Sequence, residues 1–263
     1  GGAGDDALNG EGGDDDLDGG AGNDTLYGGT GANYLDGGDG NDNLSTTGAD
    51  GTLFGGDGDD TLYATGGASY LDGEEGNNQV FAEGGNNQLN AGAGNDTLSA
   101  LGGNSYLDGG DGTNTLYADT GNNELFAGTG NDTLSAIGGN NYLDGGDGAN
   151  TLIATGGGNQ LNAGAGNDKL SASGGNNYLD AGDGANTLNA SGGGNELYAG
   201  TGDDVLNAGD GSNYLDGGDG NNSLYANGGN NTLIAGSGDD TLQAAGGNNY
   251  LDAGEGNNSL IVD

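Results

Sequence analysis

The hydrophobic residues of this chain recur at one strict interval. Every ninth residue from Leu8 to Leu260 is a large aliphatic residue, and 28 of these 29 positions are leucine. The positions between them are mostly glycine, alanine and polar residues. No insertion or deletion breaks the series, and a random polar coil would not keep such a register. The pattern therefore predicts a repeat architecture.

Each nine-residue unit reads Gly-Gly-x-Gly-x-Asp/Asn-x-Leu-x when it is counted from Gly1. Glycine at the first, second and fourth positions permits positive φ, so the backbone can turn back tightly. The leucine at the eighth position is expected to point inward from a short strand, with positions seven and nine pointing outward. Each unit thus predicts one glycine-rich turn followed by one strand.

A longer period of 36 residues is superimposed on the first. It is most visible in a tyrosine series at the seventh position: Tyr34, Tyr70, Tyr106, Tyr142, Tyr178, Tyr214 and Tyr250. No linker or change of composition interrupts the series. We therefore expect residues 1–263 to form a single uninterrupted repeat domain of 29 nonapeptide units, with a super-repeat of four units.

The pattern GGxGxDxUx is matched without departure by residues 1–9, 19–27 and 55–63 (GGAGDDALN, GGAGNDTLY and GGDGDDTLY). The chain in this respect resembles the RTX, or hemolysin-type calcium-binding, nonapeptide repeat family. The resemblance implies an all-β fold, a right-handed parallel β-roll (a β-solenoid). It further implies two nonapeptide units per 18-residue coil, two parallel sheets, and calcium along one edge.

The amino-acid composition excludes several classes of function. One Lys, no Arg and no His stand against 41 Asp and Glu, which gives a net charge of −40. By composition alone such a chain is a disordered polyanion. The lack of basic residues argues against nucleic acid as a partner, and no apolar run is long enough for a transmembrane segment. With no Cys or His, transition-metal sites and common nucleophilic or acid–base catalysis are poorly supported, so we expect no enzyme activity.

The acidic residues are not spread evenly. If two units make one coil, alternate units turn at opposite edges. The six-residue turns that start at Gly1 and recur every 18 residues hold 22 acids, and the strand ends that lead into them hold eight more. We call this the acidic edge, and the opposite one, whose turns start at Gly10 and recur every 18 residues, the asparagine edge. Carboxylates gathered beside turn carbonyls favour a hard cation, and calcium tolerates this irregular oxygen set better than magnesium.

The family resemblance implies that the sixth-position aspartate of each turn is a calcium ligand. On the acidic edge these residues are Asp6, Asp24, Asp42, Asp60, Asp96, Asp132, Asp168, Asp204 and Asp240. The alternate turns carry asparagine instead, which departs from the family pattern: Asn78, Asn114, Asn150, Asn186, Asn222 and Asn258. We expect about 14 Ca²⁺ sites along this edge, with weaker binding where asparagine replaces the aspartate.

Extra acids accompany the asparagine turns. One set lies at the third turn position (Asp111, Asp147, Asp183 and Asp219) and the other at the strand end three residues earlier (Asp108, Asp144, Asp180 and Asp216). They are predicted either to complete the alternate sites or to form an outer calcium site; a solubilising surface pair is the simpler alternative. On the asparagine edge, where only Asp15 keeps the sixth-position acid, we expect a hydrogen-bonded amide ladder and no metal.

Two faces offer contact surfaces. A row of outward threonines (Thr97, Thr115, Thr133 and Thr151) is a known ice-binding device, but threonine is also simply a good exposed strand residue. The tyrosine series on the other sheet could serve as an interface or stack on polysaccharide, or could represent cross-strand packing within the sheet. Self-association is expected, either end to end or through this tyrosine face.

Our first expectation is a secreted, extracellular or cell-surface protein in which the calcium-bound β-roll acts as a structural or adhesive element that assembles into a fibre or surface layer. The alternative is a calcium-triggered folding and secretion module of a larger RTX exoprotein. Ice-binding and polysaccharide-binding adhesin modules are further alternatives. In each case calcium outside the cell would trigger folding.

Overall fold

The computed structural model describes residues 1–48 and 50–263, which fall into two compact units, Gly1–Asp132 and Thr133–Asp263. Each unit is built from short β-strands joined by turns, and no helix occurs among the described residues. The described part of the chain accordingly has no helix long and apolar enough to cross a membrane. The all-β prediction is confirmed, whereas a single uninterrupted domain stays a prediction.

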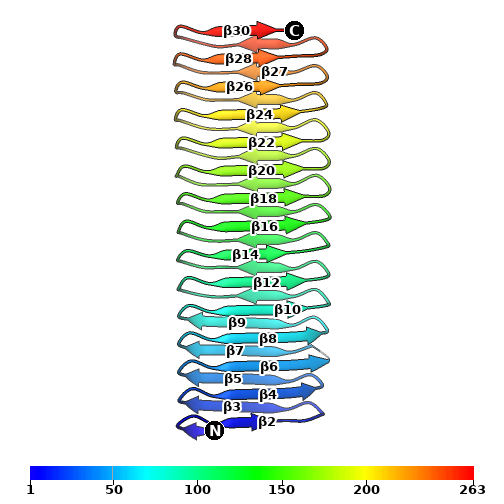
Figure 1. The fold of residues 1–263 in the computed structure, drawn as a ribbon, viewed down its shortest axis with the longest axis vertical. Coiled ribbons are helices and arrows are strands. Elements are labelled where there is room, and N and C mark those ends of the chain that lie inside the picture. Colours follow the sequence, from blue (N-terminus) through cyan, green and yellow to red (C-terminus); the bar gives the residue numbers. More distant parts are fainter. Residues whose placement is uncertain (49) are drawn as a thin grey trace. The chain divides into compact units, whose positions relative to one another are not determined.

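In the first unit the odd-numbered strands form one sheet and the even-numbered strands another (Figure 1). The odd-numbered strands are β1 (Gly2–Ala3), β3 (Asp16–Ala21), β5 (Tyr34–Asp39), β7 (Thr52–Asp57), β9 (Tyr70–Glu75), β11 (Gln88–Asn90), β13 (Tyr106–Asp108) and β15 (Glu124–Phe126). The even-numbered strands are β2 (Ala7–Asn9), β4 (Thr25–Thr30), β6 (Asn43–Gly48), β8 (Thr61–Gly66), β10 (Gln79–Glu83), β12 (Thr97–Leu101) and β14 (Thr115–Ala118).

The second unit repeats this arrangement. Its even-numbered strands are β16 (Thr133–Ile137), β18 (Thr151–Thr155), β20 (Lys169–Ser173), β22 (Thr187–Ser191), β24 (Val205–Gly209), β26 (Ser223–Ala226), β28 (Thr241–Ala244) and β30 (Ser259–Val262). Its odd-numbered strands are β17 (Tyr142–Asp144), β19 (Gln160–Asn162), β21 (Tyr178–Asp180), β23 (Glu196–Tyr198), β25 (Tyr214–Asp216), β27 (Thr232–Ile234) and β29 (Tyr250–Asp252).

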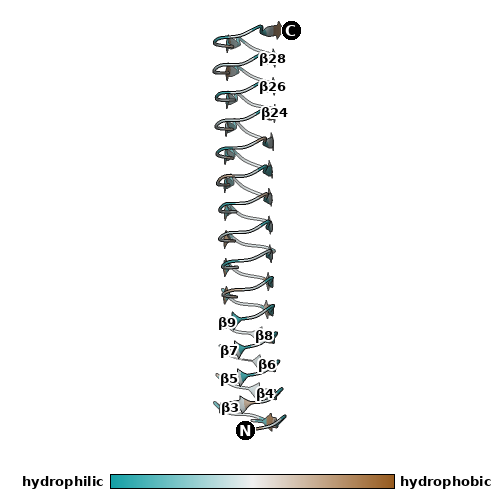
Figure 2. Ribbon diagram, turned by 90° about the vertical axis from the view of Figure 1, so that its left-hand side faces the viewer, coloured by the Kyte–Doolittle hydropathy of each residue, from teal (hydrophilic) through white to brown (hydrophobic). Residues whose placement is uncertain are grey.

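The strand register fixes the length of a coil. Within each sheet, hydrogen-bonded neighbours run parallel and are offset by 18 residues, so Leu161 of β19 pairs with Leu179 of β21, and Leu179 pairs with Leu197 of β23. Two nonapeptide units therefore make one coil, as predicted. The two sheets of a unit are seen edge-on in Figure 2, with the turns running between them.

The leucine ladder is the core of each unit. From Leu26 to Leu242 the eighth-position side chains are 0–1 % exposed, and each contributes about 1.5–3 kcal/mol through burial. A second, smaller ladder was not predicted. It consists of alanine at the first turn position, for example Ala136, Ala154 and Ala172, which are at most 3 % exposed. Alanine has replaced glycine there because the position packs inside rather than needing positive φ.

Glycine is required at the fourth turn position. Gly202 has φ of +138°, and a Cβ on it would collide with the carbonyl oxygen of Gly184 one coil earlier. The same close approach of stacked turns recurs at the corresponding glycines, for example Gly220 against Gly202. Turns stacked this closely bring the side chains of successive coils into direct hydrogen-bonding distance, which sets up the candidate site.

Candidate metal centres along the acidic edge

The sixth-position side chains of the acidic edge stack into a ladder that joins one coil to the next. In each step, the backbone N–H of one residue donates a hydrogen bond to Oδ1 of the sixth-position residue 18 positions later. The N–H of Asp24 bonds Asp42 Oδ1 at 2.6 Å, and the N–H of Asp42 bonds Asp60 Oδ1 at 2.7 Å. These side chains are 1–3 % exposed, so the ladder is internal. One carboxylate oxygen of each aspartate is thereby used within the protein.

In several of these aspartates the other carboxylate oxygen has no hydrogen-bond donor. On the acidic edge the Oδ2 atoms of several aspartates are buried and unpartnered: Asp24, Asp42, Asp60, Asp96, Asp168, Asp204 and Asp240. A buried oxygen that carries part of a negative charge is strongly destabilising unless something positive neutralises it.

A backbone carbonyl of the next coil faces the same space as each of two of these unpartnered oxygens, Asp24 Oδ2 and Asp42 Oδ2. A Cβ placed on Gly19 would lie 2.5 Å from both Asp24 Oδ2 and the carbonyl oxygen of Gly37 in the next coil. The two acceptors therefore approach the same point with no donor between them. The arrangement is repeated one coil later, where Asp42 Oδ2 and the carbonyl oxygen of Gly55 crowd the Cβ position of Gly37.

Burial changes the acidity of these aspartates. It raises the pKa of four of them to about 6: Asp60, Asp96, Asp168 and Asp204. Burial likewise raises the pKa of Asp42 and Asp132, in each case against a smaller opposing effect from the backbone hydrogen bond to the carboxylate. The upward shift of the pKa means that burial disfavours the ionised carboxylate unless a positive charge neutralises it. A bound proton or a metal cation can supply that charge.

The oxygen atoms available as metal ligands fit calcium. No group of three or more acidic, histidine or cysteine side chains converges among the residues that the structure describes. A cation here would be held by aspartate oxygens together with backbone carbonyls such as those of Gly37 and Gly55. Ca²⁺ accepts such mixed oxygen sets in irregular geometry, whereas Mg²⁺ prefers a strict octahedron with retained water. The sixth-position aspartates are thus the residues best placed to hold calcium.

The asparagine turns belong to the same ladder, but both polar atoms of the asparagine side chain have hydrogen-bond partners. Asn186 Oδ1 accepts the N–H of Asp168 at 2.8 Å. Its Nδ2 donates to the carbonyl oxygens of Gly182, Gly184 and Ala199 at 3.1–3.2 Å. Both the oxygen and the nitrogen of the side-chain amide are therefore hydrogen-bonded within the protein. This contact pattern was not foreseen from the sequence, from which asparagine was expected to offer its oxygen to a cation.

The strand-end acids have partners within the protein. Asp144 is half-buried: its Oδ1 accepts the N–H of Gly146 at 3.1 Å, and its Oδ2 accepts the hydroxyl of Tyr142 at 3.4 Å. Asp108 and Asp180 make the same pair of contacts, and Asp216 accepts the N–H of Gly218. These four predicted ligands therefore close a local turn and anchor the tyrosine series.

The third-position acids are exposed and bond along the edge. Asp147 Oδ1 accepts the N–H of Ala165 at 2.9 Å, and Asp111, Asp183 and Asp219 accept side-chain hydroxyls of the next coil. The hydroxyl and N–H of Ser237 hold the pKa of Asp219 below its usual range. The structure therefore places both members of each acid pair near one turn, and an outer calcium site at these pairs stays a prediction.

A ladder at the fifth position was missed by sequence reasoning. Here the side chain accepts from the coil that follows: Asn41 Oδ1 accepts the N–H of Asp59 at 3.0 Å, and Asp59 Oδ1 accepts the N–H of Asn77 at 2.7 Å. The N–H of Asn77 and then its side-chain amide hold the pKa of Asp59 below its usual range. The fifth and sixth positions thus bond in opposite directions along the edge. Recurrent Asn or Asp at position five was the available signal.

The opposite edge confirms the predicted amide ladder. Asn159 Nδ2 donates to Asn177 Oδ1 at 3.0 Å, and Asn177 Nδ2 donates to Asn195 Oδ1 at 2.8 Å. The same amide nitrogens also reach backbone carbonyls, such as that of Ser191. The asparagine side chains of this ladder are therefore satisfied by each other and by backbone carbonyls. Asp15, the aspartate of this ladder, has an unpartnered Oδ2 like those of the acidic edge.

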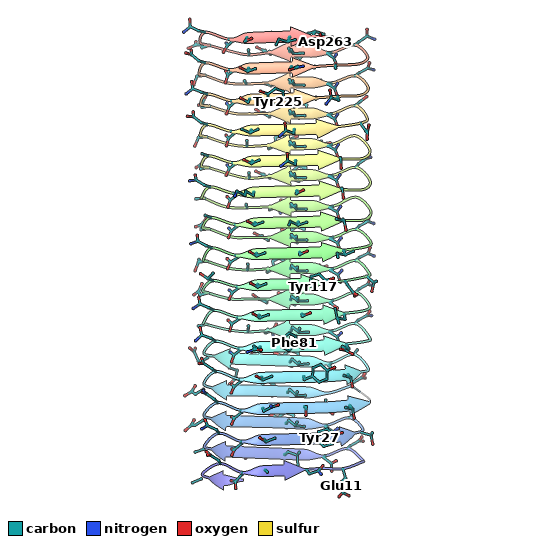
Figure 3. All side chains as sticks on the ribbon, viewed as in Figure 1. Glu11, Tyr27, Phe81, Tyr117, Tyr225 and Asp263 are labelled. Carbon is teal, nitrogen blue, oxygen red and sulfur yellow. The ribbon has the colours of Figure 1, made fainter. Side chains whose placement is uncertain are left out.

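The tyrosine series packs against its own sheet. Tyr198 lies between Tyr178 and Tyr214, with ring centroids 5.4 and 5.5 Å apart, and Phe54 lies between Tyr34 and Tyr70 in the same way. This supports the cross-strand packing alternative. The sheet of even-numbered strands also carries aromatic residues, among them Tyr27, Phe81, Tyr117 and Tyr225 (Figure 3), and Phe81 of β10 pairs in register with Tyr63 of β8.

A parallel β-solenoid whose glycine-rich turns carry buried aspartates with unpartnered oxygens is typical of one class of protein, the calcium-binding repeat proteins. A family model of the RTX calcium-binding nonapeptide repeat (four copies) matches residues 1–26, 18–53, 54–89, 90–125, 117–152, 153–188, 189–224 and 225–260. The chain belongs to this family. No curated protein matches it in a sequence search.

Proposed function

We propose that this chain is a secreted calcium-dependent β-roll that serves as a structural or adhesive surface element, and that calcium outside the cell folds it. One observation carries the proposal: the buried, unpartnered Oδ2 atoms repeated along the acidic edge. Each of them requires a positive charge at neutral pH, and the chain has only one basic side chain to supply it. The neutralising charge must therefore come from solution.

A structural role is favoured over a catalytic one because every feature of the edge recurs. A catalytic site occurs once and combines different groups, whereas here the same aspartate, carbonyl and amide contacts return coil after coil. An extended surface of identical elements suits a fibre, a surface layer or a stalk.

Calcium binding is tested by counting ions. Purified protein is dialysed against a calcium series in neutral buffer, and bound calcium per chain is measured by mass spectrometry of the metal, with magnesium as the competing ion. We expect several calcium ions per chain and little displacement by excess magnesium. A chain that retains no calcium would overturn the proposal.

The surface role is tested separately by electron microscopy of the calcium-loaded protein. Fibres or sheets that dissolve on chelation are expected. Short separate particles at all concentrations would contradict assembly and favour the folding and secretion module instead.

A further inference from the structure

We propose that the asparagine turns of the acidic edge hold no cation, because the side-chain amide nitrogen occupies the place beside the turn carbonyls that a cation would take in an aspartate turn. This inference rests on the proposed calcium function and makes it more specific. It replaces the expected row of strong and weak sites with two kinds of turn: those neutralised by a cation and those closed by an amide.

The contacts of the amide define the position. Asn186 Nδ2 lies 3.1 Å from the carbonyl oxygens of Gly182 and Gly184 and 3.2 Å from that of Ala199 in the next coil. These carbonyls belong to the second and fourth positions of its own turn and the first position of the following one. Asn114 Nδ2 likewise reaches the carbonyls of Gly110 and Ala127 at 3.1 and 3.3 Å. A group surrounded by carbonyl oxygens in this way must be a donor or a cation.

The aspartate turns share the carbonyl of the next coil but lack the donor. Asp24 Oδ2 and the carbonyl oxygen of Gly37, which is the first-position carbonyl of the next coil, approach one point. Asp24 Oδ2 is buried and has no donor. Because Asp and Asn have nearly the same shape, exchanging Nδ2 for Oδ2 turns a satisfied cluster of carbonyls into a cluster of acceptors alone. A cation resolves that repulsion in the aspartate turn, and the amide hydrogens resolve it in the asparagine turn.

The sequence then sets where cations lie. The first four acidic turns carry aspartate consecutively, from Asp6 to Asp60, and from Asn78 onward asparagine and aspartate alternate. The number of calcium ions on the ladder is therefore bounded by the nine sixth-position aspartates rather than by the number of coils. Within each alternating stretch, neighbouring cations are two coils apart, about 9.6 Å at strand spacing.

Two substitutions test this in opposite directions. Asn186→Asp should add one calcium ion per chain, because it recreates the consecutive aspartates found at Asp24, Asp42 and Asp60. Asp204→Asn should remove one, because the new amide would close its turn. The matched control is Asn189→Asp, which adds the same charge on an exposed strand position of β22 and should leave the count unchanged.

Calcium per chain is measured on each folded variant by metal mass spectrometry after dialysis, alongside the wild type. The inference is overturned if Asn186→Asp folds with calcium yet gains no ion, or if Asp204→Asn keeps the wild-type count. If Asn186→Asp does not fold, the Asp204→Asn count still decides. A wild type that binds no calcium would instead overturn the proposed function.

Discussion

At the scale of single residues, the acidic edge depends on one atom. Asp and Asn occupy equivalent places in the same ladder, and both accept a backbone N–H through Oδ1, as Asp204 does from Asn186 and Asn186 does from Asp168. They differ only in whether the second atom is an oxygen or an NH₂ group. That difference decides whether a turn is stable on its own or needs a positive charge.

The raised pKa values of the buried aspartates predict how the stability of the calcium-free protein changes with pH. Burial raises the pKa of Asp60, Asp96, Asp168 and Asp204 to about 6, above the ordinary value of 3.8. Between these values the folded state binds more protons than the unfolded state. Stability from this source is therefore present below pH 4 and is lost as the pH rises through 6. In chelator, circular dichroism should show more β-structure at pH 4.5 than at pH 7.

With calcium the pH response should reverse, because protons and Ca²⁺ compete for the same carboxylates. The apparent calcium affinity, measured by titration at pH 7 and pH 5, should be lower at pH 5. An affinity that does not change between these pH values would show that the buried aspartates are not the ligands.

At the scale of elements, one 18-residue coil is held to the next by its leucine pairs and by side-chain ladders at its turns. On the asparagine edge Asn177 Oδ1 accepts both the N–H and the side-chain amide of Asn159, and Asn177 Nδ2 donates to Asn195. All three residues are buried. At these turns the buried asparagine side chains find their hydrogen-bond partners within the protein.

Removing one amide should weaken the stack. Asn177→Ala leaves the buried backbone N–H of Asn159 without its acceptor, at a cost of about 1–3 kcal/mol. It also removes one acceptor of Asn159 Nδ2, which keeps the carbonyl oxygens of Gly157 and Ser173. The neighbouring Asn176→Ala is the control, since that exposed side chain accepts one N–H that water can replace. Denaturant midpoints in saturating calcium should fall for Asn177→Ala and hardly move for Asn176→Ala. Equal midpoints for the two variants would rule out a stabilising ladder.

The leucine ladder predicts a larger effect. Leu179 is 0 % exposed, and Leu179→Ala should lower stability by about 2–5 kcal/mol because it leaves a cavity in the core. Leu101 lies outside the ladder and is 37 % exposed, so Leu101→Ala should cost well under this amount. Thermal unfolding of both variants in calcium gives the comparison, and similar melting temperatures would argue against the leucine core.

Sequence periodicity carried much of the fold. The nine-residue interval of Leu161, Leu170 and Leu179 was enough to predict turn-and-strand units, and the family resemblance supplied the 18-residue coil that the register confirms. The hydrogen-bond partners of the turn side chains could not be predicted from the periodicity. Spacing does not say which oxygen of a side chain faces the coil before and which faces the coil after. For that reason the Tyr142 contact of Asp144 and the carbonyl contacts of Asn186 became visible only in the structure.

At the scale of the whole molecule, charge is the deciding property. A net charge of −40 on 263 residues opposes any compact state, and 30 of the 41 acids belong to one edge by the repeat register. The fold concentrates this charge instead of diluting it. A calcium-loaded edge offsets the repulsion at the place where it is greatest, so binding free energy contributes directly to folding.

The central claim is that calcium and this fold depend on each other, and far-UV circular dichroism tests it most directly. Spectra are recorded at pH 7 in chelator, in saturating calcium, in saturating magnesium, and in sodium chloride matched for ionic strength, which controls for simple charge screening. The account predicts a coil-like spectrum in all but calcium, where a β-sheet spectrum should appear and disappear again on chelation. A β-sheet spectrum of full amplitude in chelator at pH 7 would contradict it.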